Sequence, residues 1–297
     1  DGRIHGELHP LRSDDGGTVT GRFSCSKPNL QQVPARDPVI GPLIRSLFIP
    51  EEGHHWGCFD YSQQEPRLTV HYSVLTHQDG AEEAAIEYHD DDADFHQIVA
   101  DMANISRKEA KLINLGLSYG MGKEKLTKQL GISPEEAELL FEQYHKRVPF
   151  VKGLRDSAAR QGANRGYVNT ILGRKCRFNL YEPIDRRAAP YPIDKAMEEY
   201  GGQLKRAYTY KAMNRLIQGS AADMTKQAML DLHKEGIIAH TQVHDELNIS
   251  VKNIHDCKKI MEIMRDCVEL KVPNKVDGEI GKSWGDVIDY REYFKHV

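Results

Sequence analysis

IIAHTQVHDELNISV (residues 237–251) contains two apolar, strand-like runs joined by a tight turn. Side chains along a strand alternate between two faces, and so short a connection is typical of a β-hairpin, here with Asp245 at its tip. A second strand-like run, HHWGCFDYS (54–62), carries Asp60 near its end. Either acid alone is more often a turn former or a cap. Two rigidly placed aspartates, however, are what a metal-assisted phosphoryl transfer requires.

The composition indicates a folded, globular protein. Of 297 residues, 39% are hydrophobic and 28% are charged, which is ordinary for such chains. No apolar run approaches the ~20 residues of a membrane helix, and the first residues lack the basic-then-apolar order of a signal peptide. The five cysteines include no CxxC pair, so neither a disulfide framework nor a structural zinc site is indicated. We therefore expect no membrane partner and a location in the cytoplasm or its equivalent.

The net charge of −4 conceals a segregation of charge along the chain. Residues 68–106 contain nine acids and no Lys or Arg, which leaves +5 for the remainder. A basic face can therefore coexist with an acidic segment that points to solvent, and phosphate contacts depend on such a face. From charge alone, an ordinary mixed surface remains an equal alternative.

The order of elements favours the α+β class, because helices and antiparallel strands are interspersed without regular βαβ alternation. Ser106 with Glu109 forms a capping-box pattern at the start of one helix. Ser133-Pro134-Glu135-Glu136 places a cap, a proline at the first helical position and acids in the first turn of another. The remaining predicted elements are helices at 65–75, 95–103 and 254–270, a hairpin with a basic tip in GYVNTILGRKCRFNL (166–180), and a long helical region at 195–235 broken at Gly219.

The helix beginning after Ser106 has an unusual cationic face. Arg107 and Lys111 are one turn apart, so both side chains project from the same side of the helix. Cations near a helix start oppose the helix dipole, which is unfavourable for stability but suits the binding of a polyanion such as a triphosphate. The alternative is a solvated charged face. The following GMGK (120–123) does not complete a phosphate-binding loop, because the required first glycine and Ser or Thr are missing.

Three segments together resemble motifs A, B and C of family A DNA polymerases, the group of bacterial polymerase I and phage replicases. They are DYSQQEPRL from Asp60, RKEAKLINLGLSYGMG from Arg107, and QVHDE ending at Glu246, and they occur in the family's order. TGRFSCSKPNLQQVP (20–34) and NRLIQGSAADM (214–224) also resemble the family's primer–template segments. The resemblance spans nearly the whole chain and identifies it as a member of this family.

The resemblance implies the architecture of a right-hand polymerase, with an antiparallel palm sheet and helical fingers. It assigns residues 1–75 to the first part of the palm, 76–195 to the fingers and 196–297 to the second part of the palm. In this family the thumb and any exonuclease lie upstream of the palm, so we expect the thumb to be absent from this chain. The missing upstream region, or a split partner chain, would supply it.

The resemblance also implies the reaction and its cofactors. A template-directed DNA polymerase transfers a deoxynucleotide from a dNTP to a primer 3′-hydroxyl on primer–template DNA. Asp60, Asp245 and the backbone carbonyl of Tyr61 would hold two Mg²⁺ ions, for which Mn²⁺ could substitute, with Glu246 as a supporting carboxylate. Lys111 would donate a proton to the leaving pyrophosphate, and would bind the triphosphate together with Arg107 and His96.

Further positions match the family's substrate contacts. Glu65 would close the sugar pocket against a ribose 2′-hydroxyl, aided by Tyr119, which favours deoxynucleotides. Gln63 and Leu115 would belong to the same dNTP site, but Leu115 stands where the family usually has Phe or Tyr, which leaves dideoxynucleotide discrimination open. The residues matched to minor-groove contacts near the primer end are Arg22, Asn29, Gln31, Asn214, Gln218 and His244.

Two alternatives remain at the level of the sequence. A single-subunit RNA polymerase of the phage type shares the three motifs and both aspartates, but Glu65 argues against it. A non-catalytic nucleic-acid-binding remnant would have lost metal or triphosphate residues, whereas Asp60, Asp245, Arg107 and Lys111 are all present.

Overall fold

The computed structural model describes residues 2–11, 17–35, 37–89, 94–118, 124, 127–128 and 131–295. Its helices and antiparallel sheets confirm the predicted α+β class. The chain divides into two compact units. Unit 1 comprises Asp1–Gln64, Ala221–Leu270 and Asn274–Val297, and unit 2 comprises Glu65–Ser220 and Lys271–Pro273. The assignment of palm and fingers to 1–75, 76–195 and 196–297 remains a prediction.

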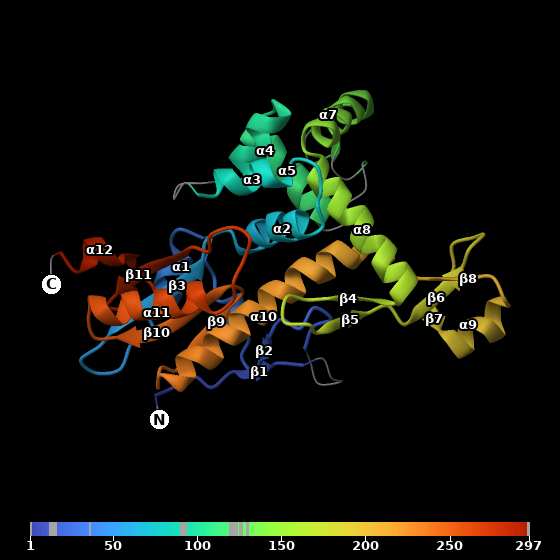
Figure 1. Cartoon of the computed structure of the whole chain (residues 1–297). Helices are drawn as coiled ribbons and strands as arrows, with labels where there is room; N and C mark the ends of the chain where they lie inside the picture. Colours follow the sequence, from blue (N-terminus) through green and yellow to red (C-terminus); the bar gives the residue numbers. More distant parts are fainter. Residues whose placement is uncertain are drawn as a thin grey trace. The chain divides into compact units, whose positions relative to one another are not determined.

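Unit 1 is built on a five-stranded antiparallel sheet in the order β12-β11-β3-β10-β9 (Figure 1). The two motif-bearing strands lie next to each other at its centre, although nearly 190 residues separate them in sequence. The strands are β3 (His55–Tyr61), β9 (Thr241–Val243), β10 (Glu246–Val251), β11 (Val276–Gly281) and β12 (Ile288–Asp289).

One face of this sheet is apolar and is covered by helix α11 (Ile254–Asp266), which contacts β3, β10 and β11. Phe59 and Leu247 are opposite each other in the ladder and are fully buried. The Tyr61 hydroxyl on the same face donates a 2.7 Å hydrogen bond to the Met264 carbonyl. Because strand side chains alternate, the intervening residues all point to the opposite face, and these are mainly acids and other polar groups.

Smaller elements complete unit 1. A cluster of Trp56, Trp284 and Phe48 packs at the end of β3 away from Asp60, with Trp56 and Trp284 stacked at a centroid distance of 6.0 Å. The elements are β1 (Glu7–His9) paired with β2 (Ser24–Ser26), the 3₁₀ helix η1 (Leu30–Gln32), α1 (Ile40–Arg45), α12 (Tyr290–Tyr293) and the second part of α10 (Ala212–Lys234).

Unit 2 is mainly helical. The predicted cap at Ser133 is confirmed and is part of a capping box, with the Ser133 and Glu136 side chains bonded to each other's backbone N–H groups. Among the helices of the described segments, none combines the length and apolar character that a bilayer span requires. The helices are α2 (Gln64–Leu75), α3 (Ala81–Glu87), α4 (Phe95–Ala103), α5 (Arg107–Ser118), α7 (Pro134–Arg147), α8 (Pro149–Arg165) and α9 (Ile193–Tyr200), with the 3₁₀ helix η2 (Thr209–Lys211).

Two small antiparallel sheets belong to the same unit (Figure 1). The predicted basic hairpin is confirmed as β4 (Tyr167–Asn169) paired with β5 (Lys175–Arg177). A three-stranded sheet in the order β7-β6-β8 follows, and α9 contacts all three of its strands. These strands are β6 (Leu180–Pro183), β7 (Tyr191–Pro192) and β8 (Leu204–Arg206).

The predicted helical region at 195–235 with a break at Gly219 is wrong. The break lies at Gly201, which ends α9 with a φ of 78° and is followed by strand β8. Gly219 lies inside the continuous helix α10. A Cβ on Gly219 would stand 2.7 Å from Thr170 Cγ2, so this glycine permits close packing rather than a break in the helix. The predicted final helix also ends earlier, at Asp266.

Substitution of Phe59 tests the central strand of unit 1. Phe59→Ala removes a ring that is 0% exposed on the face of the sheet covered by α11, so we expect it to lower the free energy of unfolding of unit 1 by about 3–5 kcal/mol. The measurement is a chemical denaturation curve monitored by circular dichroism. Leu230→Ala is the control: this residue of α10 is 50% exposed, so its replacement should change that free energy by less than about 0.5 kcal/mol. Equal effects of the two substitutions would contradict this packing.

Candidate active site

The two motif aspartates lie where β3 ends and β10 begins. Pairing of these strands places Glu246 opposite Asp60, and Asp245 precedes Glu246 in the turn from β9. His244 completes this turn with a φ of 58°, a left-handed conformation that closes the hairpin within two residues. The sequence prediction of a hairpin with Asp245 at its tip is therefore confirmed, and its partner strand is the one that carries Asp60.

The carboxylates here destabilise one another's charge. Partial loss of hydration, together with repulsion by Asp245, Glu246, Asp277 and Glu279, raises the pKa of Asp60 to about 8. Asp60 keeps solvent access at the end of its strand, so a cation can still reach it. A cation placed here would relieve the repulsion.

The pKa values of Asp245 and Glu246 are raised as well. Loss of hydration raises the pKa of Asp245, against a backbone hydrogen bond and the positive charge of Arg22. Loss of hydration also raises the pKa of Glu246, while a hydrogen bond from Asn248 and the positive charge of Arg45 oppose that increase. Arg22 was assigned from the sequence to the primer–template, and the structure places its charge near Asp245.

Two further acids on this face were missed by sequence reasoning. Asp277 pairs with Asp60 and Glu279 with Cys58 across the β3–β11 ladder, so both lie on the acidic face. They are 31 and 33 residues beyond Glu246, the end of the last motif, and only the sheet register brings them here. Among the described residues, no three His, Cys, Asp or Glu side chains are grouped closely enough to hold a metal ion by themselves. A metal ion at Asp60 and Asp245 would need further ligands.

A glutamine network connects the first candidate DNA contacts to the hairpin. Gln31 Nε2 donates to the Gln242 side-chain oxygen at 3.0 Å, and Gln242 Nε2 donates to the His244 carbonyl. Asn29 caps η1 by accepting a hydrogen bond from the Gln31 backbone N–H at 3.1 Å. Asn29, Gln31 and His244 are thus brought together within unit 1. Gln242, which joins them, was not predicted, although it lies two residues before His244.

Within unit 2, Arg107 and Lys111 are exposed on α5, whereas Ala110 and Ile113 of the same helix are buried. Arg107 Nε donates to Asp94 Oδ2 at 2.9 Å, and Lys111 is exposed one turn later. Asp94 caps α4 through the His96 and Gln97 backbone N–H groups. The same carboxylate therefore serves as a helix cap and as a partner for the arginine.

His96 adjoins this face. Loss of hydration, helped by the charges of Arg107 and Lys111, lowers the pKa of His96, although Asp94 opposes the shift. The imidazole is therefore neutral at pH 7. Its Nδ1 lies 3.2 Å from Asn114 Nδ2, and the Asn114 oxygen accepts a hydrogen bond from Tyr144. Since Nδ1 accepts from this amide, Nε2 carries the proton and can donate to an anion.

The remaining predicted residues are distributed between the units. Tyr61 follows Asp60 at the end of β3, and Gln63 lies in the following turn with a φ of 55°. Glu65 is half-buried in the first turn of α2. Leu115 lies in α5, and Tyr119 lies outside the described residues. Asn214 and Gln218 are half-exposed on one side of α10, one turn apart.

Comparison with known proteins agrees with this geometry. The family model described as DNA polymerase family A matches residues 1–286. The chain belongs to DNA polymerase family A. The sequence-based identification is therefore confirmed, and the acidic pair, the cationic helix and the hairpin all fall within the matched part of this family A chain.

Several relatives illustrate the match. A DNA-directed DNA polymerase of Pseudomonas phage M6 is 39% identical over 96% of this chain, and the thermostable DNA polymerase I of Thermus aquaticus is 33% identical over 94%. Among solved structures, the POL domain of Pol1 from M. smegmatis, in complex with DNA primer-template and dNTP, is 31% identical over 95% of this chain with a TM-score of 0.76. The chain spans 47%, 32% and 48% of the lengths of these three proteins.

The raised pKa of Asp60 predicts a pH-dependent stability. The folded state holds this proton up to about pH 8, whereas the unfolded chain releases it near pH 4, so stability is lost as the pH rises between these values. Asp60→Asn should therefore raise the melting temperature at pH 8 in a buffer containing EDTA, and the gain should shrink as the pH falls toward 5. Thermal unfolding at several pH values measures this difference.

Asp231→Asn is the control for that measurement. Hydrogen bonds from Lys234 and Gln227 lower the pKa of Asp231, so its charged form is stabilised in the fold. Asp231→Asn should therefore not raise the melting temperature at pH 8. If Asp60→Asn raised the melting temperature equally at pH 5 and pH 8, the electrostatic account would be contradicted.

Proposed function

We propose that the protein is a template-directed DNA polymerase that adds deoxynucleotides to a primer 3′-hydroxyl. The observation that carries the proposal is the pair Asp60 and Asp245, held on adjoining elements of one sheet in a surplus of negative charge. The family relationship and the names of the relatives support the same reaction. The exposed cations Arg107 and Lys111 on α5 support a triphosphate substrate.

The residues around Asp60 and Asp245 fit magnesium. Mg²⁺ prefers oxygen ligands and is commonly held by one or two carboxylates, with water and substrate phosphates filling the other positions. Two carboxylates and the backbone carbonyl of Tyr61 would make such an incomplete set, consistent with the lack of a three-residue cluster among the described residues. Asp60 and Asp245 would hold two ions, and Glu246 would support Asp60. Mn²⁺ has the same ligand preference and could substitute.

The reaction would form a bond between the primer 3′-oxygen and the α-phosphorus and break the bond to pyrophosphate. Bound Mg²⁺ would lower the pKa of the 3′-hydroxyl and neutralise charge on the triphosphate. Arg107 would bind the triphosphate, and neutral His96 would donate a hydrogen bond to it through Nε2. Lys111 Nζ would deliver a proton to the leaving pyrophosphate.

The ion pair between Arg107 and Asp94 bears on the triphosphate step. An incoming triphosphate would compete with Asp94 for the guanidinium, since both are anions that bind Arg through paired hydrogen bonds. The pair is partly exposed, so its loss costs little free energy. Asp94 would therefore keep Arg107 oriented before substrate binds without blocking the substrate.

Residues outside the reacting groups would select the substrate and hold the DNA. We propose that Glu65 and Tyr119 exclude a ribose 2′-hydroxyl, with Gln63 and Leu115 in the same dNTP site. Arg22, Asn29, Gln31, His244, Asn214 and Gln218 would contact the primer–template. The named relatives are more than twice as long as the matched region, and we propose that further sequence of this kind grips the duplex. A bacterial or phage template would place the reaction in the cytoplasm.

Removal of either aspartate should abolish the reaction. With the full-length protein, a primer–template and Mg²⁺, we expect Asp60→Ala and Asp245→Ala each to lower the rate of primer extension by about 1,000-fold or more, because several kcal/mol of transition-state stabilisation are lost. Primer–template binding should change little. Asp266→Ala, which removes an exposed acid of the same unit, is the control and should extend normally. Normal extension by either aspartate variant would refute the metal assignment.

Glu65 tests the choice of sugar. Glu65→Ala should lower the preference for dNTP over rNTP, measured as the ratio of kcat/KM values, by about 10–100-fold, because the barrier to a 2′-hydroxyl is removed. Glu82→Ala, an exposed acid on α3 of the same unit, should leave the ratio unchanged. An unaltered ratio in Glu65→Ala would remove Glu65 from the sugar site, and a wild-type preference for rNTP would favour an RNA polymerase.

A further inference from the structure

A buried amide lies directly behind the acidic centre. Asn248 on β10 is 0% exposed and stands opposite Cys58 of β3 in the ladder. Glu246 is two residues earlier on the same strand, so both side chains point to the acidic face. Burial of an amide costs free energy unless its groups are hydrogen-bonded, and leucine, with the same number of side-chain heavy atoms, would avoid that cost. The polar residue therefore calls for a specific reason.

The partners of Asn248 fix its orientation. Trp56 Nε1 lies 2.8 Å from Asn248 Oδ1, and the Cys58 thiol lies 3.1 Å from the same oxygen. The indole N–H can only donate, so the oxygen of the amide must face Trp56 and the nitrogen must face the other way. Asn248 Nδ2 then donates to Glu246 Oε1 at 2.7 Å. The amide of Asn248 thus accepts a hydrogen bond from the indole through its oxygen and donates one to the carboxylate through its nitrogen.

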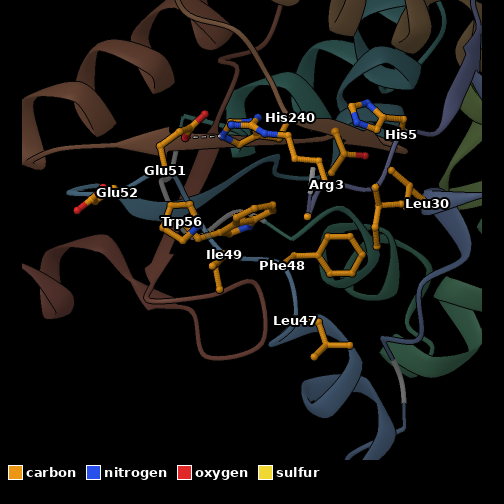
Figure 2. Close-up of a pocket in the computed structure, with 14 residues that line it drawn as sticks. Arg3, His5, Leu30, Leu47, Phe48, Ile49, Glu51, Glu52, Trp56 and His240 are labelled. Carbon is orange, nitrogen blue, oxygen red and sulfur yellow. Dashed lines mark ion pairs between the residues drawn. The ribbon is translucent and has the colours of Figure 1, made fainter.

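Trp56 is itself held on several sides. It stacks on Trp284 at 6.0 Å between centroids and lies 5.6 Å from the His240 ring. His240 Nε2 lies 3.2 Å from Glu51 Oε2 and 2.7 Å from the Ser250 hydroxyl. Figure 2 shows the Glu51–His240 pair above Trp56, where these side chains and Phe48 line a pocket of about 540 Å³. The indole donor consequently has little freedom to turn.

We propose that Asn248 is a positioning residue: its amide, oriented by the Trp56 indole, holds the Glu246 carboxylate in place beside Asp60 for the polymerase reaction. Without this bond, Glu246 could rotate away from the repulsion of Asp245 and Glu279, both of which disfavour its charge. The role in the reaction rests on the proposed function, whereas the hydrogen-bonded link does not depend on it. Partners that orient active-site ligands typically contribute 10–100-fold to activity.

The first test compares Asn248→Leu with the wild type in steady-state primer extension by the full-length protein. We expect kcat to fall by about 10–100-fold, with the KM for dNTP and the Kd for primer–template within about threefold. The loss should shrink to less than about threefold in a Glu246→Ala background, because Asn248 then has no carboxylate to position. A loss of the same size in both backgrounds would show a merely structural role and overturn the proposal.

The two tryptophans supply a matched pair of variants that keep an aromatic ring. Trp56→Phe removes the donor to Asn248, and we expect it to lower kcat by about 3–30-fold, with the same dependence on Glu246. Trp284→Phe removes an equally buried indole of the same cluster, whose Nε1 has no hydrogen-bond partner in the described part of the chain. It should leave kcat within about twofold. Equal losses of kcat in Trp56→Phe and Trp284→Phe would overturn the proposal. This comparison decides the matter even if Asn248→Leu fails to fold.

A spectroscopic measurement separates this proposal from the proposed function. The indole N–H resonance of Trp56 is the signal lost in Trp56→Phe, and Asn248→Leu should move it upfield because its acceptor is gone. Glu246→Ala should move the Trp56 resonance less than Asn248→Leu does, because the acceptor Asn248 is still present. An unmoved resonance in Asn248→Leu would disprove the link whatever the activity. If the wild type extends no primer, the polymerase proposal fails, and with it the role of Asn248 in that reaction, while the resonance still tests the link.

Discussion

The pairing of β3 with β10 is the constraint on which the site depends. It brings Asp60 opposite Glu246 and next to Asp245, from parts of the chain that are far apart in sequence. A shift of one residue in this register would turn Asp60 toward α11 and Phe59 toward the acidic face. The buried side chains of Phe59 and Leu247 on the other face exclude that shift. The apolar packing against α11 therefore fixes the position of the carboxylates.

The sheet stabilises an arrangement that electrostatics opposes. Four other carboxylates repel the charge of Asp60, and the pKa values of Asp60, Asp245 and Glu246 are all raised. Neighbouring charges from Arg22 and Arg45 offset these increases only in part. A site of this kind has a strong electrostatic reason to bind a divalent cation. The same surplus of negative charge explains why Glu246 would need Asn248 to stay in place.

Much of the fold and of the site could be predicted from the sequence, because the signals involved are local. The hairpin at Asp245, the capped helix after Ser133 and the cationic face of α5 each follow from residues a few positions apart. The helix break was misplaced at Gly219, because the tight contact of Thr170 with that glycine is a tertiary feature. Asp277, Asn248 and the pairing of Asp94 with Arg107 were missed for the same reason, since strand register or packing between helices brings them to the site.

The central claim is that Asp60 and Asp245 are metal ligands whose pKa values are raised, mainly by loss of hydration, until a cation binds. Calorimetric titration of Mn²⁺ into the protein at pH 7, in two buffers with different enthalpies of ionisation, measures the protons released on binding. Because the pKa of Asp60 lies near 8, we predict proton release at pH 7, less release at pH 9, and none attributable to this pair in the Asp60→Asn, Asp245→Asn double variant. Binding without proton release, or with the same release in the double variant, would contradict the account.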